Sequence, residues 1–172
     1  MHRLAYCAAL ACLAALAHAQ TTPVPKPPPE LKQLDYFAGK WNCDAITKPS
    51  NAKTVGTSQC VWFKGGFVLE CQSHDTVPQE STGVLVLGYS TTEKAYTAYS
   101  YGSTGSMPSV SKGQRQATTW TWNGEGTYSK KPAKYQVTMT EDSPVKYSVQ
   151  SRRSVEGGPW TVLSEGSCTK EK

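Results

Sequence analysis

Residues 60–71 read CVWFKGGFVLEC, a stretch that predicts a β-hairpin closed by a disulfide. If the central glycine pair forms a two-residue turn, Trp62 lies opposite Leu69 and Cys60 lies opposite Cys71. Alternate side chains of a strand share one face, so both cysteines lie on the face of Trp62 and Leu69. This register makes the cysteines a hydrogen-bonded pair, whose wide Cα spacing suits a disulfide less well unless the turn is longer.

The rest of the chain after residue 40 is also patterned for β-structure. Segments with alternating, β-branched or aromatic residues are separated by turn residues, including a predicted turn at Asn123-Gly124. The predicted strands are 41–48, 53–64, 67–77, 82–90, 94–102, 110–122, 135–140, 145–155 and 160–168. Nine or ten strands at hairpin spacing predict an all-β fold, a single antiparallel barrel over residues 30–172. Before them, Leu31, Leu34 and Phe37 recur with a period of three and predict a short N-terminal helix.

The beginning of the chain predicts export. Residues 1–19 have a basic start, an apolar run of about 13 residues and the small-residue pattern Ala17-His18-Ala19, which together are typical of a signal peptide. The run is shorter than the roughly 20 residues that a membrane span needs. We therefore expect a periplasmic or secreted protein with no membrane span in its mature form, in which residues 20–29 form a Pro-rich tether.

Removal of the leader leaves four cysteines, Cys43, Cys60, Cys71 and Cys168, an even number that predicts two disulfides in an exported chain. Cys60–Cys71 leaves Cys43–Cys168 by elimination, which would join the first strand to the last. A rival pairing, Cys43–Cys60 across a hairpin centred on residues 51–52, also fits the numbering. No pair has C-x-x-C spacing, so the sequence predicts no metal site.

The charged residues and the single mature histidine give little support to catalysis, cofactors or nucleic-acid binding. The net charge is +5, but lysines and arginines are scattered and form no basic stripe. Ser73, His74 and Asp75 are neighbours on a strand, so they alternate between faces and cannot form a relay. We expect a monomeric protein that is not an enzyme and holds no cofactor, with His74 on the surface.

Three motifs resemble a known family. Glu30–Trp41 (ELKQLDYFAGKW), Gly65–Phe67 (GGF) and Gly83–Tyr89 (GVLVLGY) are similar, in order and spacing, to a group of bacterial secreted proteins with a lipocalin-like (calycin) domain of unknown function. Gly39-Lys40-Trp41 resembles the G-x-W entrance of lipocalins. The resemblance implies a lipocalin-like barrel with a closed end plugged by Trp41 and an interior able to hold a small apolar molecule. It implies no reaction. A haem-ligand role for His74, by analogy with nitrobindin barrels, is a weaker alternative.

Aromatic residues carry the binding hypothesis, because aromatic-lined concave sites bind small apolar ligands. The alternative is that these rings fill the barrel, as in a structural or protein-interaction module without a ligand. The resemblance also implies that a late-strand arginine, best matched by Arg153, stacks over Trp41, although Arg153 could instead meet an acidic ligand group or lie exposed. The candidate ligand-binding residues are Trp62, Tyr99, Tyr101, Trp120, Trp122, Tyr147 and Arg153, with Gly39 and Trp41 as structural residues.

Overall fold

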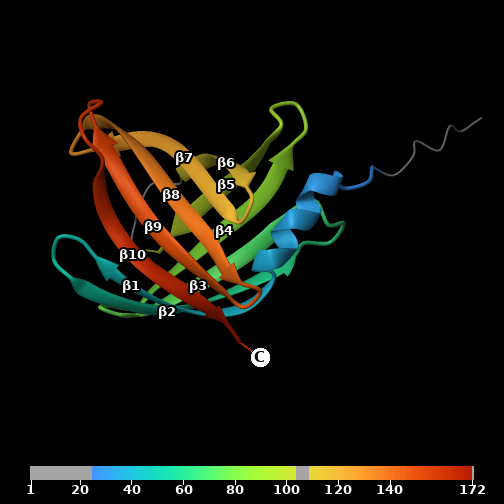
Figure 1. Ribbon diagram of the computed structural model, residues 1–172, viewed down its shortest axis with the longest axis horizontal. Helices are drawn as coiled ribbons and strands as arrows, with labels where there is room; N and C mark the ends of the chain where they lie inside the picture. Colours follow the sequence, from blue (N-terminus) through green and yellow to red (C-terminus); the bar gives the residue numbers. More distant parts are fainter. Residues whose placement is uncertain (1–24, 104–108, 172) are drawn as a thin grey trace, which may run out of the picture.

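Ten antiparallel strands close into one barrel in the computed structural model, which describes residues 25–103 and 109–171 (Figure 1). A 3-10 helix, η1 (Pro29–Phe37), precedes the strands and is blue in Figure 1. The strands are β1 (Gly39–Thr47), β2 (Ala52–Trp62), β3 (Leu69–Val77), β4 (Ser81–Ser90), β5 (Ala95–Gly102), β6 (Ser109–Gln116), β7 (Thr119–Tyr128), β8 (Lys131–Ser143), β9 (Lys146–Val155) and β10 (Thr161–Lys170). The predicted all-β barrel with a short N-terminal helix is confirmed. The predicted leader and the first half of the tether lie outside the described residues.

The hairpin of β2 and β3 has the predicted register but a longer turn. Trp62 pairs with Leu69 and Cys60 pairs with Cys71, and the two cysteines form a disulfide. The backbone N–H of Phe63 donates to the carbonyl of Val68, so four residues rather than two lie in the loop. Since pair types alternate along a ladder, this bond makes Cys60 and Cys71 a non-hydrogen-bonded pair, the closer kind. The longer turn thus removes the geometric objection to the disulfide.

The barrel closes where β1 pairs with β10, and the second disulfide lies on this seam. Cys43 pairs with Cys168 in the ladder, and their sulfur atoms are bonded across 125 residues of chain. On its other side, Cys43 faces Gly56 of β2. The rival pairing of Cys43 with Cys60 is wrong because the β1–β2 hairpin turns at residues 48–51, which shifts Cys60 opposite Gly39.

The segment predicted as one strand from 110 to 122 is two strands, β6 and β7. The chain turns at Ala117-Thr118, between the paired residues Gln116 and Thr119. Ala117 has a φ of 52°, a left-handed conformation uncommon outside glycine. The predicted turn at Asn123-Gly124 is wrong, since both residues lie inside β7. Gly124 is needed there for close approach instead: a Cβ on it would lie 2.9 Å from the Ser111 hydroxyl oxygen of β6.

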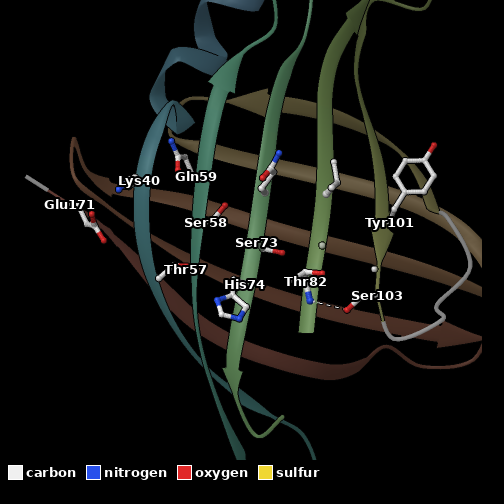
Figure 2. Close-up of a pocket in the computed structure, with 14 residues that line it drawn as sticks. Lys40, Thr57, Ser58, Gln59, Ser73, His74, Thr82, Tyr101, Ser103 and Glu171 are labelled. Atoms are coloured by element: carbon white, nitrogen blue, oxygen red, sulfur yellow. Dashed lines mark hydrogen bonds between the residues drawn. The ribbon is translucent and has the colours of Figure 1, made fainter. Parts of the chain in front are cut away.

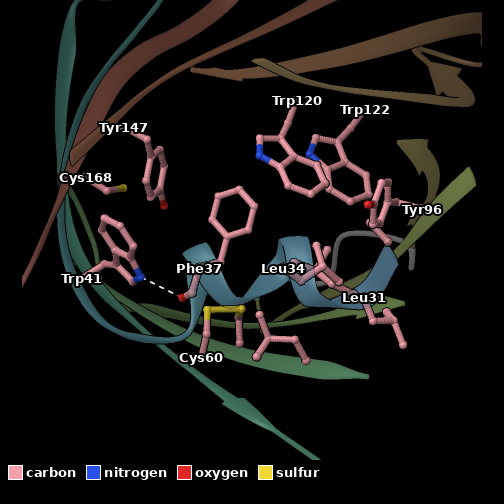
Figure 3. Close-up of a cluster of buried hydrophobic side chains, with 14 residues drawn as sticks. Leu31, Leu34, Phe37, Trp41, Cys60, Tyr96, Trp120, Trp122, Tyr147 and Cys168 are labelled. Carbon is pink, nitrogen blue, oxygen red and sulfur yellow. Dashed lines mark hydrogen bonds between the residues drawn. A yellow bond between two sulfur atoms is a disulfide. The ribbon is translucent and has the colours of Figure 1, made fainter. Parts of the chain in front are cut away.

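The helix η1 fills one end of the barrel. A 3-10 helix has three residues per turn, so residues spaced by three share one face, and Leu31, Leu34 and Phe37 are all buried. Figure 3 shows these three side chains, called here the helix plug, directed at the rings of the barrel wall. The Phe37 ring lies 5.3 Å from that of Trp120 and 5.8 Å from that of Tyr147. The buried core therefore lies at this closed end.

Trp41 is 1% exposed and anchors the first strand to the plug. Its indole N–H donates to the carbonyl oxygen of Phe37 at 2.8 Å, and its ring meets that of Tyr147 edge-on at 4.8 Å. Gly39, just before it, has a φ of 111°, a region that favours glycine. A glycine at this position thus allows the chain to turn from the helix into β1, and Trp41 enters the closed end.

Candidate functional site

An interior cavity of about 150 Å³ lies between the helix plug and the open half of the barrel. It is lined mostly by apolar and aromatic side chains, with the Cys60–Cys71 disulfide among them. Among the described residues of its lining, the hydroxyl side chains are those of three serines and Tyr147. The lining residues are Phe37, Trp41, Ser58, Cys60, Cys71, Leu85, Leu87, Ala98, Ser100, Ser111, Trp122, Val137, Met139 and Tyr147.

The cavity floor is made of aromatic rings from three elements. Phe37 comes from η1, Trp41 from β1 and Tyr147 from β9. Burial, and to a lesser degree the charge of an ionised Tyr36, raises the pKa of the Tyr147 phenol far above its ordinary value. Tyr147 is therefore neutral at every physiological pH, and the floor presents no charge to an occupant.

Trp122 lines the cavity flat against the strand beside it. A Cβ on Gly113 of β6, its ladder partner, would overlap the Trp122 ring, so only glycine leaves room for the ring there. Trp122 also stacks on Trp120, with centroids 5.9 Å apart and planes 5° from parallel. This stack fixes the orientation of the Trp122 ring, so that the cavity wall is held in shape before any ligand enters.

Towards the open end of the barrel, the cavity lining changes from apolar to hydroxyl. Ser58 of β2, Ser100 of β5 and Ser111 of β6, called here the serine rim, lie one inward position beyond Cys60, Ala98 and Gly113 on the same strands. The rim is small as well as polar, because serine side chains occupy little volume. It leaves a passage between the cavity and the barrel mouth.

Of the predicted aromatic ligand contacts, the structure brings Trp122 and Tyr147 to the cavity and leaves Trp62 and Trp120 beside it. The Trp62 indole N–H donates to the Asp35 carboxylate at 2.8 Å, so this ring fastens η1 to the barrel. The Trp120 indole N–H donates to the Glu141 carboxylate at 2.7 Å. Both tryptophans therefore support the closed end and do not line the cavity.

Tyr99 and Tyr101, also predicted as ligand contacts, lie on the outer face of β5 and not at the interior cavity. They are 43% and 51% exposed. On β5, Tyr96 and Ala98 are the inward residues, so the odd-numbered positions point outward. The sequence predicts that side chains alternate between the two faces of this strand, and they do. It does not decide which face points inward, because tyrosine alternates with small residues and either face could be the inner one.

Arg153 does not cover Trp41. That role belongs to Lys170 near the C-terminus, whose ammonium lies 5.0 Å from the centroid of the Trp41 ring. Arg153 lies on the inward face of β9 near the mouth, where its guanidinium stacks on the Tyr128 ring at 3.3 Å. The resemblance to lipocalins implied an arginine over the tryptophan, and the strand register places that arginine too far from the closed end.

The aliphatic and serine lining of the cavity was not predicted from the sequence. Leu85, Leu87, Val137 and Met139 lie on strands whose predicted alternation is right, but nothing in the sequence distinguishes a lining residue from a fully packed one. The serine rim had a usable signal, since Ser58 has the same parity as Cys60 and so had to face inward.

A larger, open and polar depression lies on the outer face of β1–β5, shown in Figure 2. Its exposed lining includes Thr57, Gln59, Gln72 and His74. The His74 imidazole contacts the Glu80 carboxylate at 3.1 Å, and both side chains are solvated. Long polar side chains in water hold no fixed shape, so we take the interior cavity as the candidate site. Because His74 lies on the outer face of the barrel, it is unsuited to ligate a haem in the interior.

No three histidine, cysteine, aspartate or glutamate side chains in residues 25–103 and 109–171 are grouped to hold a metal ion. Within the same ranges, no helix is long and apolar enough to cross a membrane.

The sequence from η1 to the end of β10 matches a known protein family. A family model described as "Protein of unknown function (DUF1579)" matches residues 26–170. The chain belongs to the DUF1579 family. No curated protein matches the sequence.

Solved structures with low sequence identity share the fold of this DUF1579 barrel. Rv2717c from M. tuberculosis matches with a TM-score of 0.58 and 11% identity, covering 86% of this chain and 100% of that one. The S-type phycobiliprotein lyase CPES from Guillardia theta matches with a TM-score of 0.56 and 11% identity, covering 82% of this chain and 92% of that one. At such identities the likeness establishes the fold of the DUF1579 barrel and nothing about its ligand.

Proposed function

We propose that this DUF1579 protein is an exported, lipocalin-like carrier that binds a small apolar molecule inside its barrel. The observation that carries the proposal is the interior cavity of about 150 Å³ with its aromatic floor and apolar walls. An apolar cavity of about this size in another protein stays dry and binds benzene. A single ring or a short aliphatic group is therefore the size of occupant that this cavity suits.

Two features support the export part of the proposal. The first is the predicted signal peptide, residues 1–19. The second is that all four cysteines outside it are joined in disulfides, which form and persist in oxidising compartments. Amino-terminal sequencing of the protein recovered from its host tests this part. A start at Gln20 in the periplasmic or secreted fraction supports it, and an intact Met1 in the cytoplasm contradicts it.

The cavity dimensions also limit the ligand. A haem macrocycle has four fused pyrrole units, much more than a ring-sized cavity can enclose, and the only histidine of the mature chain is on the outer face. Binding of a compact molecule fits the geometry better. The competing interpretation, a filled barrel that serves only as an interaction module, requires that the cavity have no ligand affinity at all.

The test is a binding titration with a panel of neutral ring compounds, followed by calorimetry or native mass spectrometry. Ala98 lines the cavity, so Ala98→Leu fills it and should lower affinity about tenfold or more. Tyr99→Leu changes the adjacent outward residue and should leave affinity unchanged, which makes it the matched control. If no compound of the panel binds, or if Ala98→Leu binds as well as the original protein, the cavity is not a ligand site.

A further inference from the structure

The barrel interior holds a second feature that an apolar ligand does not explain, the arginine at its mouth. Arg153 has inward parity on β9, between Ser151 and Val155, and is half-buried. One face of its guanidinium is covered by the Tyr128 ring at 3.3 Å. Stacking of this kind holds the planar group in place but satisfies none of its N–H donors.

Arg153 differs from the other two arginines of the barrel. Arg115 forms two hydrogen bonds with the Glu141 carboxylate, at 3.0 and 2.9 Å. Arg152, on the outer face, donates to Gln136 and stacks on Trp160. Among the residues that the structure describes, Arg153 forms neither an ion pair nor a side-chain hydrogen bond, whereas Arg115 and Arg152 form at least one of these. A half-buried cation without a counter-charge is costly, so an anion that reaches it gains more than it would at an exposed arginine.

The register places Arg153 close to the cavity. Val137 of β8 lines the cavity and pairs with Ser151 of β9. The next inward pair towards the mouth is Tyr135 with Arg153. Two residues of strand span about 7 Å, and the stack on Tyr128 holds the guanidinium towards the mouth, so a ligand in the cavity needs a flexible linker of several bonds to reach it.

The interior therefore changes in character along the barrel axis. An aromatic floor and an apolar cavity come first, followed by the serine rim. A hydroxyl pair, Ser151 and Ser164 at 2.7 Å, lies at the level just below Arg153. This order matches a molecule with an apolar end and a negatively charged end.

We infer that the natural ligand is a small amphipathic carboxylate, whose ring or short alkyl group fills the cavity and whose carboxylate accepts hydrogen bonds from Arg153. The inference rests on the proposed function, since it assigns the second half of the same site. A planar carboxylate fits the fork of a guanidinium through two parallel hydrogen bonds, which a lysine cannot offer. Tyr128 holds the guanidinium ready for this contact.

The test compares 4-phenylbutyrate with its neutral amide, 4-phenylbutyramide, by calorimetry on the disulfide-bonded protein. The two probes share the apolar end and differ in charge at the other. The original protein should bind the acid about tenfold or more tightly than the amide, because only the carboxylate adds an opposite charge and two acceptor oxygens for the guanidinium. Arg153→Gln should abolish this preference by lowering the affinity for the acid much more than the affinity for the amide.

Arg152→Gln is the matched control, because it removes the same charge from the neighbouring outward position. It should keep the preference for the acid. Arg153→Lys, which keeps the charge but not the fork, should show an intermediate preference. Circular dichroism of each variant checks that the barrel is folded.

The outcomes separate the two proposals. If the original protein binds acid and amide equally, or if both glutamine variants lose the preference alike, the anion site is wrong while the apolar cavity stands. If neither probe nor any neutral ring compound binds, the proposed function itself is wrong. A preference for the acid that only the Arg153 variants change would support both.

Discussion

The Lys170 ammonium lies 5.0 Å from the centroid of the Trp41 ring and donates to the Tyr36 carbonyl oxygen at 3.2 Å. The last residue of the last strand thus covers the tryptophan that opens the first strand. The indole is buried on all sides, by the Phe37 carbonyl, the Tyr147 ring and this lysine stem. Packing of the indole, rather than the cation–π contact, should supply most of the stabilisation.

Trp41→Ala should therefore lower the free energy of unfolding by about 3–5 kcal/mol, the usual cost of removing a large buried ring. Lys170→Met, which keeps the apolar stem, should cost no more than about 1 kcal/mol. Urea unfolding followed by circular dichroism measures both. Lys40→Met, at the exposed position before Trp41, is the control for loss of a lysine charge. A cost below about 1 kcal/mol for Trp41→Ala would mean that the ring does not close the barrel end.

The two disulfides should contribute unequally, because they close loops of different length. Cys43–Cys168 spans 125 residues and Cys60–Cys71 spans 11. Loop-closure entropy gives about 5 kcal/mol for the seam disulfide and about 3 kcal/mol for the hairpin disulfide. The double variant Cys43→Ser, Cys168→Ser should therefore unfold at lower urea than Cys60→Ser, Cys71→Ser. The reverse order would indicate that the seam stays closed in the unfolded ensemble or that the hairpin disulfide has a further role.

The part of the fold that could be predicted from the sequence is the part that local chemistry determines. The period of three in Leu31, Leu34 and Phe37 predicted a short helix, and the observed helix, with three residues per turn, buries all three residues on one face. The spacing of Cys60 and Cys71 around a glycine pair predicted their register. In both cases the deciding residues lie within about a dozen positions of one another.

The parts that could not be predicted depend on distant residues. The turn at Ala117-Thr118 contains no residue that favours a turn. Asn123-Gly124 is a sequence that favours a turn, but it lies inside β7. The bulk of Trp122 and the neighbouring strand decide which residues fit there. Likewise, Lys170 rather than Arg153 covers Trp41 because the β1–β10 register pairs Trp41 with Lys170. The cavity itself is a gap between side chains of many strands, and no single segment encodes it.

The ion pair between Arg115 and Glu141 should contribute more than the other ion pairs. The side chains are 27% and 12% exposed, and the carboxylate also accepts the Trp120 indole N–H. Glu141→Gln should lower the free energy of unfolding by about 2–4 kcal/mol, since it leaves a largely buried guanidinium without its partner. Glu93→Gln is the control, because the Lys112–Glu93 pair is exposed and should contribute less than about 1 kcal/mol. Thermal and urea unfolding measure both costs. If Glu141→Gln cost no more than Glu93→Gln, this would show that water reaches Glu141.

The phenol of Tyr36 should make the protein sensitive to alkaline pH. Desolvation by burial, and to a lesser degree the charges of Glu141 and Asp142, raises the pKa of Tyr36 from 10.0 to about 12. Its hydroxyl donates to the carbonyl oxygens of Ser143 and Lys146 at 2.9 and 2.7 Å, and only the neutral phenol can donate. Below pH 10 this contribution to stability is fully present. Between pH 10 and about 12 the unfolded chain ionises first, so stability falls, and above about pH 12 the contribution is lost.

Tyr36→Phe isolates this effect, because every other titrating group is shared with the original protein. At neutral pH the variant should be less stable by about 1 kcal/mol, the net value of one hydrogen bond, because the single phenol hydrogen is shared between the two carbonyl oxygens. The difference between the two proteins should shrink as pH rises from 10 towards 12, since the original protein loses the phenol's contribution and the variant has none to lose. Urea unfolding at several pH values measures this difference. A gap that stays constant over this range would show that Tyr36 is solvated and that its hydroxyl does not tie the helix end to the β8–β9 turn.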